Sequence, residues 1–126
     1  MSLRTPLARA RGLGSAKDGV AHWWAQRVTA VLLAPLSLWF LCCALPMLGA
    51  DYADARVWLA QPCNALLMLA FVLAAIYHAL LGVQVVIEDY IHQRWIEITL
   101  LTSIKLIAFF AMLATALAVV RIAVGG

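Results

Sequence analysis

The stretch LLMLAFVLAAIYHALLGVQVVIEDY, residues 66–90, decides the fold. About 21 apolar or small residues, interrupted by one histidine, precede an acidic pair, and this is the length that a bilayer-spanning helix requires. Ionisable groups inside a bilayer are costly and usually functional, so His78 is the main candidate for chemistry. At 100° per residue, Gly82 and Asp89 return to within roughly 40° of the direction of His78. One face of the helix therefore carries all three residues.

Composition indicates that the whole chain is a membrane protein. Hydrophobic residues make up 66% of its 126 positions, well above the share in a soluble domain. Three long apolar runs leave no room for a soluble catalytic domain, so any chemistry takes place in the membrane or in a partner. The net charge of +3 is concentrated near the N-terminus and indicates an orientation signal rather than nucleic-acid binding. The predicted fold class is an all-α integral membrane protein.

The apolar pattern divides the chain into two parts. Residues 1–21 are expected to form a basic, flexible arm, and residues 22–126 a membrane-anchor domain. Pro35 is expected to kink the first span, and Pro46 to help end it. The predicted transmembrane helices cover about residues 28–48, 62–87 and 98–120, with short polar breaks at 49–61 and 88–97.

The positions of lysine and arginine predict the orientation. Five of these residues precede the first span, whereas each polar break and the C-terminal end carry one. The excess of positive charge on cytoplasmic segments then places the N-terminus and the second break in the cytoplasm and the C-terminus outside. Arg27, Asp89 and Tyr90 would all lie at the cytoplasmic interface.

A membrane histidine such as His78 has three ordinary uses, and the residues alone leave all three open. It can hydrogen-bond a neighbouring carbonyl, relay protons, or ligate haem iron. A relay needs further titratable groups, and the span offers none before its acidic pair. A haem needs small residues beside its ligand, and a second axial ligand would have to come from another chain. The small residues near His78 are Ala74, Ala75, Ala79 and Gly82.

The residues at the end of this span form a second candidate site. Asp89 and Tyr90 could simply cap and anchor the helix. A carboxylate at a helix C-terminus is disfavoured by the macrodipole, however, so Asp89 suggests a nearby cation, for which Arg27 is the expected partner. Tyr90 offers a phenolic hydroxyl that can donate to a carbonyl ligand at the membrane edge.

Two segments resemble a known family. HWWAQRVTAVLLAPLSLWF, residues 22–40, is similar to an H-W-x-x-Q-R-x-T-A segment, and HALLGVQVVIEDY, residues 78–90, resembles an H-x-x-x-G-x(6)-D-Y pattern. Both are typical of the small hydrophobic membrane-anchor subunit of succinate dehydrogenase (succinate:quinone oxidoreductase, complex II) of the alphaproteobacterial type. Together with the three spans, they cover most of the chain after residue 21.

The resemblance implies specific roles. His78 would be an axial ligand of a haem b shared with a partner cytochrome b subunit. Tyr90 would hydrogen-bond ubiquinone, Asp89 would adjoin that site, and Arg27 would lie near the quinone or the haem propionates. A flavoprotein subunit and an iron–sulfur subunit would oxidise succinate on the cytoplasmic side of the bacterial inner membrane. The alternatives are the anchor of a quinol:fumarate reductase and a non-redox small membrane protein in which His78 makes a polar packing contact.

Overall fold

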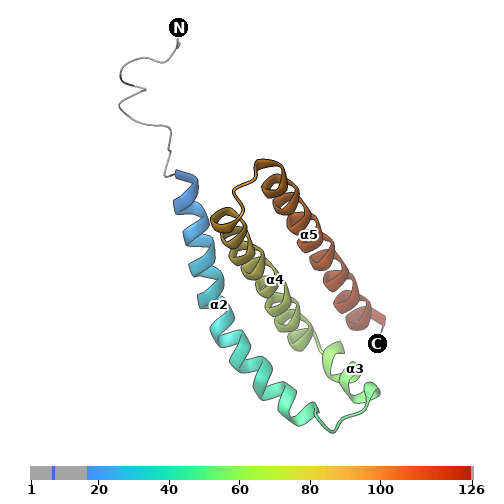
Figure 1. The fold of residues 1–126 in the computed structure, drawn as a ribbon. Helices are drawn as coiled ribbons and strands as arrows, with labels where there is room; N and C mark the ends of the chain where they lie inside the picture. Colours follow the sequence, from blue (N-terminus) through green and yellow to red (C-terminus); the bar gives the residue numbers. More distant parts are fainter. Residues whose placement is uncertain (1–6, 8–16, 126) are drawn as a thin grey trace.

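The computed structural model is all-helical and describes Leu7 and residues 17–125 (Figure 1). Its elements are α2 (Lys17–Met47), α3 (Tyr52–Ala60), α4 (Pro62–Tyr90) and α5 (Arg94–Gly125). The three long helices α2, α4 and α5 are long and apolar enough to cross a membrane. The predicted all-α fold with three membrane spans is confirmed.

Helix α4 lies in the middle of the bundle, between α2 and α5, and packs against both of them (Figure 1). The three long helices run antiparallel to their sequence neighbours, and α3 lies at the end of the bundle where α2 finishes. The start of α2, the end of α4 and the start of α5 therefore meet at the opposite end. This arrangement brings the polar ends of all three spans together.

The helices extend beyond the predicted spans. Helix α4 continues to Tyr90, and α5 occupies residues 94–125 rather than 98–120. Helix α2 begins at Lys17, inside the stretch expected to be a flexible arm, and residues 1–6 and 8–16 of that stretch lie outside the described residues. Both Pro35 and Pro46 lie inside α2, which bends along its length (Figure 1).

Most of the polar break predicted at residues 49–61 is helical, because α3 lies within it. The side chain of Asp51 caps this helix by accepting a hydrogen bond of 2.9 Å from the backbone N–H of Asp54. The ring of Trp58 then stacks on that of Trp39 in α2, with 5.9 Å between ring centroids. A cap and an aromatic contact thus fold a short polar segment onto the end of the bundle.

The described residues do not form a closed core. None of their large side chains is fully buried, and the buried positions are mostly small or aliphatic residues on the faces where helices meet. Large apolar side chains are exposed on all three long helices, for example Leu38, Leu66 and Phe110. Such exposure suits lipid and a neighbouring membrane subunit, since water would oppose it.

Candidate functional site

His78 points from α4 towards α2, and both of its ring nitrogens have partners there. Nδ1 lies 2.8 Å from Oγ1 of Thr29, and Nε2 lies 3.2 Å from the side-chain nitrogen of Gln26. Gln26 and Thr29 are three residues apart and therefore share one face of their helix. The half-buried imidazole thus bridges the first and second membrane spans.

The hydroxyl of Thr29 decides the protonation of the imidazole. Its oxygen lies 2.8 Å from the carbonyl oxygen of Ala25 and 3.0 Å from that of Gln26, and in both contacts the hydroxyl is the donor. The hydroxyl has one hydrogen, so it donates to the backbone carbonyls and accepts from His78. Nδ1 of His78 is therefore protonated, and Nε2 carries a lone pair that accepts from the amide of Gln26.

Two polar atoms on the same face of α2 are buried without a partner among the described residues. They are Nε2 of His22 and Oε1 of Gln26. His22, Gln26 and Thr29 follow one another at intervals of four and three, so they form a polar stripe at the start of an otherwise apolar helix. Buried polar atoms are nearly always hydrogen-bonded, so this stripe is suited to a further polar group from outside the chain.

Gly82 lies on the same side of α4, one turn beyond His78. A Cβ atom at position 82 would sit 3.9 Å from the side-chain nitrogen of Gln26. The helix face predicted to carry His78 and Gly82 therefore faces α2 at Gln26. The small residue leaves room for the side chain of Gln26 between the two helices.

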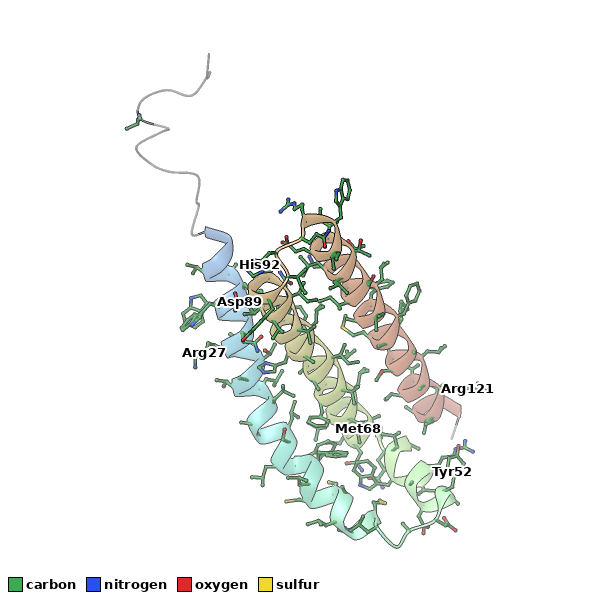
Figure 2. The ribbon with its side chains drawn as sticks, viewed as in Figure 1. Arg27, Tyr52, Met68, Asp89, His92 and Arg121 are labelled. Atoms are coloured by element: carbon green, nitrogen blue, oxygen red, sulfur yellow. The ribbon has the colours of Figure 1, made fainter. Side chains whose placement is uncertain are left out.

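Asp89 and Tyr90 lie at the end of α4, at the same end of the bundle as Arg27 (Figure 2). All three are exposed, and Tyr90 is 76% exposed. In this structure they are therefore accessible to a ligand or partner at the membrane edge. These three are the predicted site residues other than His78, and all of them lie on the surface.

The suggested ion pair between Arg27 and Asp89 is not formed among the described residues. Among residues 17–125, the ion pair within 4.0 Å joins Arg94 and Glu97. The guanidinium of Arg27 instead lies over the ring of Trp23, 5.2 Å from its centroid, on the outer side of α2 (Figure 2). The physical reason is helical geometry, because Arg27 directly follows Gln26 and is rotated about 100° from the face that meets α4.

The imidazole of His78 is suited to bind the iron of a haem. His78 offers an Nε2 lone pair, with Nδ1 held by a hydrogen bond as is usual for a metal-ligating histidine. Within the described residues, no group of three or more histidine, cysteine or acidic side chains lies together. A haem, which brings its iron in a porphyrin, needs only one or two protein ligands, so His78 fits this group.

Sequence reasoning identified His78 but missed its two partners. Gln26 and Thr29 are polar residues at helical spacing at the start of an apolar span, and this spacing was the available signal. Gln26 lies 52 positions and Thr29 lies 49 positions before His78, so their contact with it depends on how α2 packs against α4, which the spacing does not specify.

Three membrane-spanning helices with a half-buried histidine between two of them define a multi-pass membrane subunit with a polar site between its first two spans. Residues 1–120 match the family described as succinate dehydrogenase/fumarate reductase transmembrane subunit, and this chain belongs to that family.

Several curated proteins are similar to the chain. A succinate dehydrogenase hydrophobic membrane anchor subunit of Rickettsia bellii is 39% identical over 117 residues, which cover 92% of this chain and 93% of the relative. The corresponding subunit of Paracoccus denitrificans is 34% identical, with 68% and 67% of the two chains covered. A succinate dehydrogenase membrane anchor subunit of Reclinomonas americana is 34% identical over 76% and 82%. No solved structure matches the chain.

Proposed function

We propose that this chain anchors a succinate dehydrogenase in the membrane and helps to bind haem b and ubiquinone. In this proposal His78 is one axial ligand of the haem iron, and Tyr90 and Asp89 adjoin the quinone. The observation that carries the proposal is the histidine between α2 and α4, whose Nδ1 is held by Thr29 while its Nε2 keeps a lone pair. The family membership supports the same reading.

The haem would be shared with a partner cytochrome b subunit. A second protein ligand would come from that partner, because His78 is the one histidine within the three predicted spans. When bound, the haem supplies one-electron redox chemistry between the soluble subunits and the quinone. His78 holds the iron, and the small residues around it allow the flat ring to approach α4.

The quinone site is proposed at the end of α4. Reducing a quinone to a quinol requires two electrons and two protons. The hydroxyl of Tyr90 can donate a hydrogen bond to a quinone carbonyl oxygen, and the carboxylate of Asp89 can hold a proton at the water interface. Eleven residues separate His78 from Asp89, a rise of about 16 Å along the helix. Arg27 lies at the same end and supplies positive charge near the quinone or the haem propionates.

The partners follow from this assignment. A flavoprotein subunit oxidises succinate, an iron–sulfur subunit passes the electrons on, and both lie on the cytoplasmic side where Tyr90 and Asp89 emerge. The membrane is the bacterial inner membrane, with the N-terminus in the cytoplasm and the C-terminus outside. The relatives named above are all succinate dehydrogenase subunits, which favours this direction of the reaction over fumarate reduction.

The experiment is purification of the complex through a tag on this chain, followed by a reduced-minus-oxidised absorption spectrum of the same sample. We expect a b-type haem band together with a flavoprotein, an iron–sulfur protein and a second small membrane chain. We also expect succinate-dependent reduction of ubiquinone. A complex that lacks haem and these partners would contradict the proposal and favour a packing role for His78.

A further inference from the structure

We infer that Thr29 and Gln26 are positioning residues that prepare His78 for its iron. Thr29 fixes the tautomer that leaves Nε2 free of a proton, and Gln26 covers this lone pair until the haem displaces it. The inference rests on the proposed haem role of His78 and adds two residues on the first membrane span to the site. It predicts opposite effects for the two side chains.

Thr29 makes short hydrogen bonds both to its own helix and to His78. The hydroxyl donates to the carbonyl of Ala25 at 2.8 Å and accepts from Nδ1 of His78 at 2.8 Å. Thr29 is only 9% exposed, so water does not compete well for these contacts. A hydrogen bond from the second ring nitrogen orients a ligating histidine and makes it more basic. Thr29 therefore holds the ring in the orientation and protonation state that a metal ligand needs.

Gln26 and an iron atom would compete for the same nitrogen atom, Nε2 of His78. The amide nitrogen of Gln26 lies 3.2 Å from Nε2 of His78, the ring nitrogen that would bind the iron. The lone pair of Nε2 cannot accept a hydrogen bond and bind iron at once, so the amide must move when haem binds.

Two features lower the free-energy cost of moving the amide of Gln26 away from His78. Oε1 of Gln26 is buried and has no partner among the described residues, so the present position of the amide is only half satisfied. Gly82 beside it has no side chain, and this gives the glutamine space between α2 and α4. Gln26 thus behaves as a temporary cap on a buried lone pair, which would otherwise be unsatisfied before the haem arrives.

The expected effects have opposite signs. Removing the hydroxyl in Thr29→Val should weaken haem binding roughly 10- to 100-fold, as loss of such an outer partner typically does. Removing the competing amide in Gln26→Met, which keeps the chain length, should tighten haem binding about 2- to 12-fold, the equivalent of one hydrogen bond. Thr29→Val should also raise the haem reduction potential, because a less basic imidazole stabilises ferric iron less.

The test uses the whole complex, made in haem-deficient cells and titrated with haemin, with binding followed by the absorption band. The reduction potential is measured on complexes purified from haem-replete cells, so that a result is obtained even where the haem-free complex is unstable. Thr29→Ser, which keeps a hydroxyl, should behave like the wild type. Thr115→Val is the matched control, because Thr115 makes the same bond to the carbonyl four residues earlier, at 2.9 Å, but does not contact His78.

The outcomes separate this inference from the proposed function. If His78→Ala abolishes the haem band while Thr29→Val and Gln26→Met match Thr115→Val in affinity and potential, the positioning roles are wrong and the haem role stands. If Gln26→Met weakens haem binding, Gln26 supports the bound haem and is not a displaceable cap. If His78→Ala keeps the wild-type haem band, the proposed function itself fails.

Discussion

The hydroxyl oxygen of Thr29 and Nδ1 of His78 lie 2.8 Å apart and join the first membrane span to the second. Because the hydroxyl donates its hydrogen to its own helix, its oxygen accepts a hydrogen bond from the Nδ1–H group of His78, and Nε2 is left as the basic atom. Two apolar helices are thereby joined by a specific polar contact near the start of the first span. The same contact holds the imidazole of His78 between α2 and α4.

Tyr90→Phe should slow quinone reduction about 10-fold or more, because the substrate carbonyl loses a hydrogen-bond donor at a step that requires protons. Oxidation of succinate by an artificial soluble acceptor should be unchanged, since that reaction uses other subunits. The two activities are measured on the same purified complex. Tyr52→Phe, at the opposite end of the bundle (Figure 2), is the matched control and should leave both rates unaltered. Equal losses of the two activities in Tyr90→Phe would count against a quinone site at this residue.

Arg27 and Asp89 should act independently, because they do not form an ion pair in this structure. We expect the effects of Arg27→Gln and Asp89→Asn on quinone reduction to add within about 0.5 kcal/mol of activation free energy in the double variant. The measurement is a double-mutant cycle on kcat/KM for ubiquinone. A coupling above 1 kcal/mol would show that the two side chains meet in the assembled complex.

Position 82 should tolerate a methyl group but not a large side chain. A Cβ atom there would lie 3.9 Å from Gln26, which is an ordinary van der Waals distance. Gly82→Ala should therefore retain the haem and the thermal stability of the complex, whereas Gly82→Leu should push α2 away from α4 and release haem. Haem content per flavin and the midpoint of thermal unfolding report both effects. A Gly82→Leu complex with full haem content would show that α2 and α4 do not pack closely at this level.

Asp51→Ala should destabilise the short helix α3 by about 1 kcal/mol, because the backbone N–H of Asp54 loses its capping partner. Asp51→Asn retains a capping oxygen and should remain close to the wild type. Hydrogen exchange of the α3 amides in the purified complex measures the local effect. Unchanged exchange in Asp51→Ala would mean that α3 is held mainly by the stacking of Trp58 on Trp39.

The sequence predicts the features of the fold that depend on local residue patterns. Length and hydrophobicity predict three spans, and the segment from His78 to Tyr90 predicts a histidine inside one span and a polar end to that span. The sequence did not predict α3, since its polar composition resembles a loop and its cap at Asp51 is a single side chain. It also suggested an ion pair for Arg27, because charge alone does not say which face of α2 meets α4.

The contacts of His78 depend on packing between helices far apart in sequence. Gln26 and Thr29 were visible as polar residues in an apolar context, but their partner was not. The position of α4 between α2 and α5 decides which faces meet (Figure 1). Helix packing, rather than any one-dimensional pattern, therefore assigns the tautomer of the candidate ligand.

The central claim is that His78 binds haem iron, and the most direct test is the reduced-minus-oxidised spectrum of the complex carrying His78→Ala. His92→Ala, at the exposed end beyond α4 (Figure 2), is the matched control. We expect the His78 variant to insert and assemble with its haem band lost or shifted, and the His92 variant to keep the wild-type spectrum. A wild-type haem band in the His78→Ala complex would contradict the account.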